Sequence, residues 1–320
     1  MTGQDTQHDR GSDPEHDPGS DPGSDASDPG SGTEAARAAV DPGLARQVWG
    51  RLEAIHVLAY VAPEVQAAHT ALGLGDRGTG YVAGRSAPFG PVGPEVVTAA
   101  FHGFAPRLIR HALPAAWERA RPEAVLEATT TAVRGVLAGL LDGAATLEQA
   151  AVLAREAADH QPILGRPLAA AWSSVPFSDD PVTVLWQAAS RIRESRGDGH
   201  VALLVEAELD GVEAHLTTRG DSPKLRRILG ATRAITDAEW DAAADRLRQR
   251  GLLAEDGALT VAGQQLRMRL EQRTDELTVP GWSALGRERT ETLRTALDPL
   301  VARVLEPGLV PGVVARVATS

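Results

Sequence analysis

The residues best suited to chemistry begin in the stretch "QVWGRLEAIHVLAY". Trp49, His56 and Tyr60 recur there at spacings of seven and four, which place them on one face of a helix. Imidazole is the side chain whose unperturbed pKa lies nearest neutral pH, so His56 is a candidate acid/base or ligand contact. The same position also suits a core histidine that is hydrogen-bonded within the protein. Trp49, His56 and Tyr60 are therefore candidate ligand contacts.

A second group of candidates follows in "TGYVAGRSAPFGPV", which we interpret as a Gly/Pro-rich loop. Four candidate ligand contacts occur in it: Tyr81, Arg85, Ser86 and Phe89. An arginine held by a stiff segment between two aromatic residues can fork a carboxylate or a phosphate, and a nearby serine can assist it. The alternative for Arg85 is an ion pair with a neighbouring helix, through Glu53 or Glu64.

One further candidate comes from the second half of the chain. His200 follows Gly197-Asp198-Gly199 at an expected helix start, where it either approaches the ligand or makes a capping or interdomain hydrogen bond. The glycines of "GLGDRG" follow a helix rather than a strand, which excludes a dinucleotide site. The chain has no cysteine and no spacing typical of metal ligands. We predict no metal site, and the pattern names no cofactor.

Turn and cap signals divide the chain into three parts. Residues 1–40 carry nine acidic and two basic side chains in repeats of Asp-Pro-Gly-Ser. Such a segment buries too little apolar surface to become ordered, so we expect a disordered acidic tail over residues 1–38. Helical signals then begin at Asp41-Pro42, and "SVPFSDDP" indicates a hinge. We expect a helical domain with the Gly/Pro-rich loop over 39–176 and a second domain over 177–320.

The second domain has the element order of a winged helix-turn-helix. The expected helices are 182–195, 199–208, 211–218, 222–231, 237–250, 260–277 and 287–305. Asp256-Gly257 is a strong hairpin signal and predicts short strands at 252–254 and 258–260. The fold class is therefore mainly α: an N-terminal helical bundle followed by a winged helix-turn-helix with a small β-hairpin wing.

The stretch "ITDAEWDAAADRLRQRGLLAEDGALTVAGQQLRMRLEQRTDEL" carries a family resemblance. It resembles the recognition helix, wing and following helix of MarR-type regulators, whose pattern is "RLxxRGLL", a hairpin and "LTxxG". The whole chain, with "GYVAGRSAPFGPV" ahead of "GHVALLVEAELDGVEAHL", resembles an actinobacterial family of helix-turn-helix proteins. The preference for Arg over Lys also fits a GC-rich genome. The resemblance implies a winged-helix fold and transcriptional regulation, with DNA as a partner.

The charges of the expected recognition helix argue against a simple DNA contact. Such a helix meets anionic DNA with its N-terminal residues, but Asp237, Glu239 and Asp241 lie at that end. Glu255-Asp256 occupies the tip of the expected wing. A basic patch is nonetheless available in and after "SPKLRR", and its residues are Lys224, Arg226, Arg227 and Arg233.

These observations lead to two functional hypotheses. The first is a small-molecule-binding protein of winged-helix regulator ancestry, a ligand-responsive transcription regulator that binds an anionic or aromatic ligand between its domains. The alternative is an enzyme, of specialised metabolism for example, with His56 as acid/base, Arg85 as anion clamp and the winged helix as scaffold. The helix at 287–305 is a candidate for homodimer formation.

We infer the cellular location from the lack of a membrane helix and of a signal peptide in the sequence. No apolar run approaches the roughly 20 residues of a membrane helix, and the acidic N-terminus is unlike a signal peptide. We therefore expect a cytoplasmic protein without membrane contact.

Overall fold

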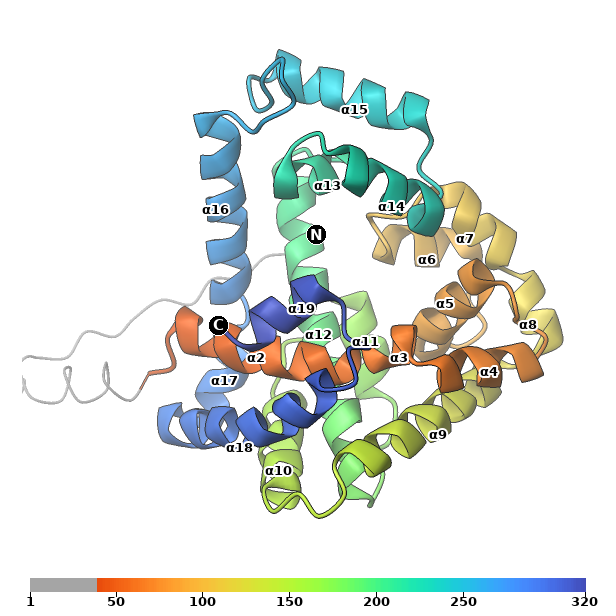
Figure 1. The fold of residues 1–320 in the computed structure, drawn as a ribbon, viewed down its shortest axis with the longest axis vertical. Coiled ribbons are helices and arrows are strands. Elements are labelled where there is room, and N and C mark those ends of the chain that lie inside the picture. Colours follow the sequence, from red (N-terminus) through yellow and green to blue (C-terminus); the bar gives the residue numbers. More distant parts are fainter. Residues whose placement is uncertain (1–38) are drawn as a thin grey trace, which may run out of the picture. The chain divides into compact units, whose positions relative to one another are not determined.

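The computed structural model describes residues 39–320, which fold mainly into helices (Figure 1). The predicted disordered tail, residues 1–38, lies outside the described residues. The first half contains α2 (Pro42–His56), α3 (Leu58–Val61), α4 (Pro63–Ala71), α5 (Arg77–Ser86), the 3-10 helix η1 (Ala87–Phe89), α6 (Pro94–Ala100), α7 (Pro106–Ala112), α8 (Ala115–Arg119), α9 (Pro122–Leu140), α10 (Leu147–Asp159) and α11 (Pro167–Ser173). The second half contains α12 (Pro181–Glu206), α13 (Gly211–Arg219), α14 (Pro223–Arg233), α15 (Asp237–Gln249), α16 (Val261–Glu276), α17 (Val279–Leu285), α18 (Arg287–Leu305) and α19 (Gly312–Ala318). No helix of this described range is long and apolar enough to cross a membrane.

Side-chain caps fix the starts of several helices. The carboxylates of Asp41 and Asp180 and the hydroxyl of Thr260 each accept a hydrogen bond from the main-chain amide three residues further on, at 3.0, 3.0 and 3.1 Å. Such a cap satisfies one of the amides that a helix leaves unpaired at its first turn. The predicted starts of α2, α12 and α16 are thereby confirmed.

The long helix α12 lies at the centre of the fold and packs against α2, α10, α11 and α16. We expected a break near Gly197-Asp198-Gly199, and this is wrong, because α12 continues through these residues to Glu206. Gly199 lies against the guanidinium of Arg166, where a Cβ would be 3.4 Å away. A Cβ would make only ordinary van der Waals contact at Gly199, so the glycines here belong to a continuous helix and do not end it.

The predicted Gly/Pro-rich loop is largely helical, which corrects our expectation for that segment. Residues 77–86 form α5, capped by Asp76, whose carboxylate accepts a hydrogen bond from the Thr79 amide at 2.8 Å. Gly80 and Gly84 face His69 of α4, where a Cβ would lie 3.1 and 2.9 Å from its ring. These glycines let two helices approach each other, and they do not form a turn.

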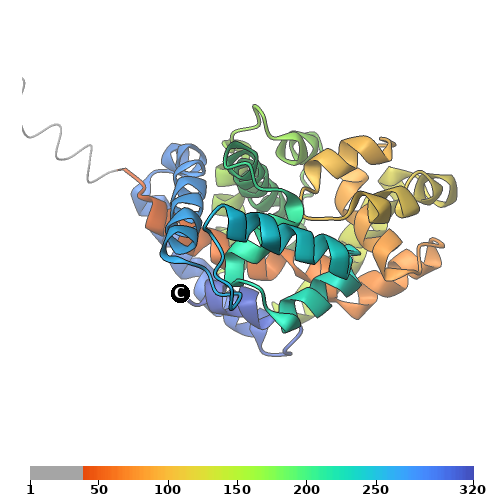
Figure 2. The ribbon, with the colours of Figure 1, turned by 90° about the horizontal axis from the view of Figure 1, so that it is seen from above.

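Helices α13, α14 and α15 form the predicted helix-turn-helix around a core that they share with the end of α12 and with α16. Trp240 of α15 is fully buried there, and its indole nitrogen donates to Asp221 at 2.8 Å. Figure 2, seen from above, shows α15 beside α14 and across α13. The three helices begin and end within two residues of the positions expected from the sequence.

The wing differs from the expected hairpin. Between residues 252 and 260 the structure has no strand, but a turn closed by one antiparallel bridge between Leu253 and Leu259. The Ala254 amide donates to the Ala258 carbonyl at 2.8 Å, so Asp256-Gly257 does form the predicted turn. One further hydrogen bond follows the bridge, from the Thr260 amide to the Leu252 carbonyl at 3.1 Å, and the same Thr260 caps α16.

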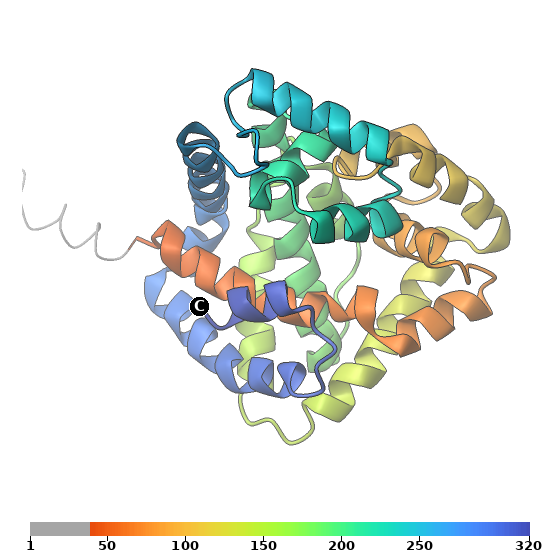
Figure 3. The same ribbon diagram turned by 45° about the horizontal axis from the view of Figure 1, so that its top comes forward.

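The two C-terminal helices pack against α2, the first helix of the described residues. Both α18 and α19 pack against α2, as Figure 3 shows, and α18 also packs against α10. The apolar face of α18 thus contributes to the internal core, and the predicted homodimer through this helix stays a prediction. Helices from both sides of residue 177 share this core. The division into two domains at that residue stays a prediction.

Candidate functional site

His56 is buried between α2 and α12, where both of its ring nitrogens have partners. Nδ1 lies 2.9 Å from Ser190 Oγ, and Nε2 lies 3.0 Å from the Tyr60 hydroxyl. Ser190 donates to the Trp186 carbonyl, so its oxygen accepts from Nδ1, and Nε2 is left to accept from Tyr60. Burial, with the charge of Arg193 adding to it, lowers the pKa of His56. The imidazole is therefore neutral and occupied by internal hydrogen bonds.

The contact between α2 and α12 continues as a polar seam from this histidine towards the start of α2. Glu53 lies 3.5 Å from Arg193, and the guanidinium of Arg196 lies 3.9 Å from the ring centre of Trp49. Burial raises the pKa of Glu53, against the opposing charge of Arg193. The seam thus holds two of the predicted contacts, Trp49 and His56, against charged side chains of α12.

Arg85 makes an ion pair, but with a partner that the sequence did not suggest. Its Nε and Nη2 donate to the two carboxylate oxygens of Glu194 at 3.1 and 2.9 Å, and Arg193 donates to the same carboxylate at 2.6 Å. The Glu194 side chain is fully buried. Burial alone would raise its pKa, but the charges of Arg193 and Arg85 lower that pKa to about 2. The expected partners Glu53 and Glu64 do not bond to Arg85.

A row of aromatic rings connects these helices to the helix-turn-helix. The ring centre of Tyr81 lies 4.7 Å from that of Tyr60 and 5.3 Å from that of Phe104, and the guanidinium of Arg233 lies 3.7 Å from the Phe104 ring centre. Together with the neighbouring charges they form what we call the arginine–aromatic cluster: Tyr60, Tyr81, Arg85, Phe104, Arg193, Glu194 and Arg233. It unites three predicted ligand contacts with one predicted DNA contact.

Three other predicted ligand contacts lie outside this cluster. Ser86 is buried and donates to the Val82 carbonyl of its own helix at 2.7 Å. Phe89 packs into the core around α5 and α9. His200 lies 2.8 Å from the Thr274 hydroxyl of α16, and burial lowers its pKa to about 4. In each case the polar atom or ring serves a contact within the protein.

The segment between α6 and α7 holds the start of α13. His102 Nε2 lies 3.0 Å from the Leu209 carbonyl, and His215 Nε2 lies 2.9 Å from the Gly103 carbonyl. At Gly211 a Cβ would be only 2.1 Å from the His102 carbonyl oxygen. Two main-chain segments that are far apart in sequence therefore touch here, and glycine is needed for that approach.

The same segment also holds the turn between α14 and α15. The Ala105 amide donates to the Arg233 carbonyl at 3.1 Å, and Arg107 makes an ion pair with Glu239 and a hydrogen bond to the Ala234 carbonyl. Ala234 has a φ of +55°, which is uncommon for a residue other than glycine. The turn of the helix-turn-helix is thus fastened to α7 on both sides of a strained residue.

A cleft of about 470 Å³ lies at this junction. Its lining includes Thr98 and Phe104 from the N-terminal part, and Val212, Ile235 and Ala242 from α13 to α15. Within the described part of the chain, the predicted ligand contacts do not line it. The sequence analysis missed this cleft, because its lining consists mainly of small and apolar residues without a recognisable spacing.

The outer face of α15 is acidic in the structure as in the sequence. Asp237, Asp241 and Asp245 recur every four residues, and their side chains are 83%, 62% and 66% exposed. Arg226 of α14 pairs with Asp237 and Asp241, each at 2.6 Å. Arg248 pairs with Asp245. The cations nearest to this face are therefore occupied by its own carboxylates.

The four predicted DNA contacts have different surroundings. Lys224 and Arg227 are exposed on α14. Arg226 is paired with carboxylates of α15, and Arg233 is packed on Phe104 in the arginine–aromatic cluster. The predicted basic patch is thus limited to Lys224 and Arg227.

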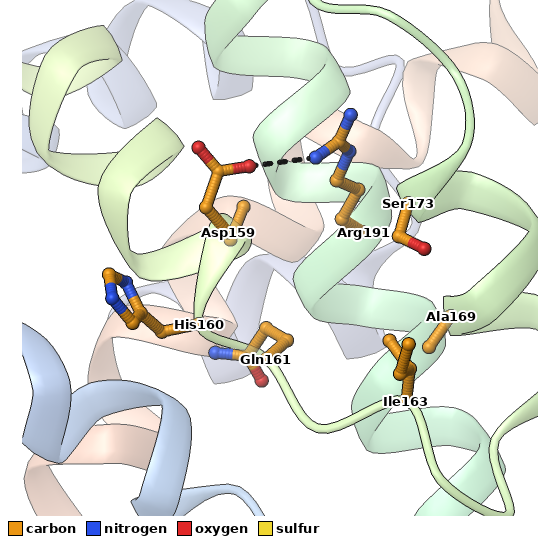
Figure 4. Close-up of a pocket in the computed structure, with 8 residues that line it drawn as sticks. Asp159, His160, Gln161, Ile163, Ala169, Ser173 and Arg191 are labelled. Atoms are coloured by element: carbon orange, nitrogen blue, oxygen red, sulfur yellow. Dashed lines mark hydrogen bonds and ion pairs between the residues drawn. The ribbon is translucent and has the colours of Figure 1, made fainter.

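A smaller pocket of about 340 Å³ lies between α10, α11 and α12. Figure 4 shows Asp159 and Arg191 facing each other across 2.9 Å, while His160 and Gln161 point away from Ala169. Its charged groups therefore neutralise each other. Among residues 39–320, no three His, Asp or Glu side chains are grouped so that they would hold a metal ion.

The three-helix motif around its buried core and the single-bridge turn that follows define a helix-turn-helix protein. The chain belongs to the Helix-turn-helix family, whose model matches residues 45–311. Such proteins are typically DNA-binding regulators. Neither the curated proteins nor the solved structures contained a significant match. The closer resemblance to MarR-type regulators and an actinobacterial origin stay predictions.

Proposed function

We propose that this protein is a DNA-binding transcription regulator that responds to a small molecule held where the N-terminal helices meet α13–α15. The observation that carries the proposal is the junction itself. Contacts from residues 102–107 hold the start of α13 and both sides of the turn between α14 and α15. A molecule that changes this junction changes the position of α15.

Physical coupling requires that the small molecule bind one arrangement of the junction better than another. The cleft of about 470 Å³ supports this, since α15 supplies one of its walls and α6 another. A volume of this size accommodates a small organic ligand. The occupant would touch the helix whose position it controls.

The exposed Lys224 and Arg227 of α14 favour this helix as the main phosphate contact. The acidic face of α15 would repel the backbone of DNA unless it is turned aside. We therefore propose that α14 contributes at least as much as α15 to the affinity for DNA.

The enzyme alternative receives less support. Both ring nitrogens of His56 are engaged within the protein, and both sides of the Arg85 guanidinium fork meet Glu194. An acid/base and an anion clamp each need a free atom that faces the substrate. The regulator hypothesis does not depend on such an atom.

The test measures the affinity of the full chain for fragments of its own genome by fluorescence anisotropy at several salt concentrations. We expect the double substitution Lys224→Ala and Arg227→Ala to weaken binding to all fragments and to reduce the salt slope by about 2, since each phosphate contact contributes about 1. Arg121→Ala, an exposed arginine at the start of α9, serves as the control and should change neither quantity. If the wild-type chain shows no affinity at low salt, the protein is not a DNA-binding regulator.

A further inference from the structure

The N-terminal end of α15 is fastened to α7, which lies beside the turn between α14 and α15 (Figure 1). Arg107 of α7 donates from Nη1 to Glu239 Oε1 at 2.7 Å and from Nη2 to Glu239 Oε2. Nη2 also donates to the Ala234 carbonyl. Glu239 is the third residue of α15, and Ala234 lies three positions before that helix. We call these bonds of Arg107 to Glu239 and Ala234 the α7–α15 contact.

The carboxylate of Glu239 has two tasks in this contact. Besides pairing with Arg107, it accepts a hydrogen bond from the Thr236 amide at 2.8 Å, and the Thr236 hydroxyl accepts one from the Glu239 amide at 3.3 Å. This is the capping box that closes the first turn of α15. The hydrogen bonds from Arg107 lower the pKa of Glu239 to about 2, so the ion pair is formed at neutral pH. One side chain thus both closes the first turn of α15 and ties it to α7.

The segment before α7 approaches the same end of α15 from the side of the cleft. Pro106, Glu239 and Ala242 line this cleft of about 470 Å³ together. The Ala105 amide donates to the Arg233 carbonyl at 3.1 Å, just before the turn that leads into α15. The turn and the first two turns of α15 therefore lie against residues 105–107.

The N-terminal end of the last helix is the part of a helix-turn-helix that meets the base edges of DNA. In this protein that end is occupied by contacts from the same chain. We propose that the α7–α15 contact is autoinhibitory: it holds α15 back from the major groove, and DNA has to open it. This inference rests on the proposed function, because it concerns how the same helix-turn-helix is regulated.

The exposure of the ion pair fits a contact that opens. The side chains of Arg107 and Glu239 are 45% and 41% exposed, and an ion pair between such exposed groups contributes little to stability. Water replaces its hydrogen bonds easily when the helices separate. The exposed Lys224 and Arg227 on α14 take no part in the contact, so they can meet phosphates before it opens.

The test measures the affinity of the full chain for fragments of its own genome, by fluorescence anisotropy at several salt concentrations. Arg107→Gln should strengthen binding about two- to fivefold and leave the salt slope unchanged, because it removes an inhibitory contact. An arginine that contacts phosphate would have the opposite effect: its loss weakens binding and reduces the slope by about 1. Arg110→Gln is the matched control, since Arg110 lies on the same helix and pairs with Glu95 outside the helix-turn-helix. Weaker binding in Arg107→Gln than in Arg110→Gln would overturn the proposal.

A double substitution tests whether Arg107 acts through Glu239. Glu239→Gln removes the other charge of the ion pair, and glutamine can still complete the capping box. Adding Arg107→Gln to this variant should raise the affinity for DNA less than about twofold further, because the two substitutions break the same contact. A gain as large as in the wild-type background would show that Arg107 acts by another route, and it would overturn the proposal.

Amide hydrogen exchange without DNA tests the constraint on α15 by itself. The amides of residues 236–240 should exchange faster in Arg107→Gln than in Arg110→Gln, because the first turn of α15 is released. Equal exchange in the two variants would overturn the proposal. A lack of DNA binding by the wild-type chain and by every variant would refute the regulator, and the inhibitory role with it. DNA binding that is strong in the wild-type chain and weaker in Arg107→Gln would refute the inhibitory role alone.

Discussion

The ion pair between Arg85 and Glu194 should be among the most important single contacts for stability. The Glu194 side chain has no surface exposed to water, and its charge is met by the guanidinium groups of Arg85 and Arg193. Although burial opposes ionisation, these arginines lower its pKa from 4.5 to about 2, which corresponds to about 3 kcal/mol in favour of the ionised form. Arg85 also lies 4.3 Å from the ring centre of Phe101.

Arg85→Met should therefore lower the free energy of unfolding by up to about 3 kcal/mol at pH 7, because it leaves a buried carboxylate with Arg193 as its remaining partner. The assay is urea unfolding of the full chain followed by circular dichroism. Adding Glu194→Gln to this variant should recover part of the loss, because the two substitutions remove one interaction.

The pH dependence of the free energy of unfolding is a second test of the same ion pair. A carboxylate whose pKa is lowered on folding stabilises the protein fully above pH 4.5 and loses this contribution as the pH falls towards 2. In Arg85→Met that loss between pH 4.5 and 2 should be smaller than in the wild-type chain. Arg110→Ala is the matched control, since its ion pair with Glu95 is exposed at both ends and should contribute about 0–1 kcal/mol. If Arg85→Met costs no more than this control, the reasoning from burial is refuted.

Two further predictions concern Gly211 at the junction and the buried His200. Gly211→Ala should lower the free energy of unfolding by about 2 kcal/mol or more, because its Cβ would meet the His102 carbonyl oxygen at 2.1 Å, and urea unfolding should show Gly139→Ala, which has open space, to be harmless. Burial lowers the pKa of His200 to about 4, so the stability it provides is complete above about pH 6.5 and is lost as the pH falls to 4. His200→Gln, which can still bond Thr274, should make the free energy of unfolding depend less on pH over that range. An unchanged pH dependence, measured by urea unfolding at several pH values, would contradict this.

Local signals account for the elements that were predicted correctly. Asp41, Asp180 and Thr260 cap helices in the structure as their positions before Pro or apolar residues indicated. The helix-turn-helix was found because its helices and turns are marked by residues close together in sequence. Family membership and the mainly helical fold follow from the same patterns.

The candidate site could be predicted only in part. Helical spacing placed Tyr60 and His56 together, and their hydrogen bond agrees with it. The partner of Arg85, by contrast, lies 109 residues away in the chain, and nothing near Arg85 indicates it. Phe104 and Arg233 meet only because the segment after α6 packs on the end of α14.

The sequence by itself determined where the capped helices α2, α12 and α16 begin, which residues are apolar and which end of α15 is acidic, because these properties depend on neighbours within a few positions. Tertiary structure alone decided that α12 continues through Gly197 and Gly199, because this helix packs against α2, α10, α11 and α16 along its length. It also decided that α5 is a helix, since Gly80 and Gly84 use the small size of glycine to approach His69 and not its freedom to turn. It also decided which charges are paired. Only when distant helices come together does Arg233 remain as the cation of the cluster without a carboxylate.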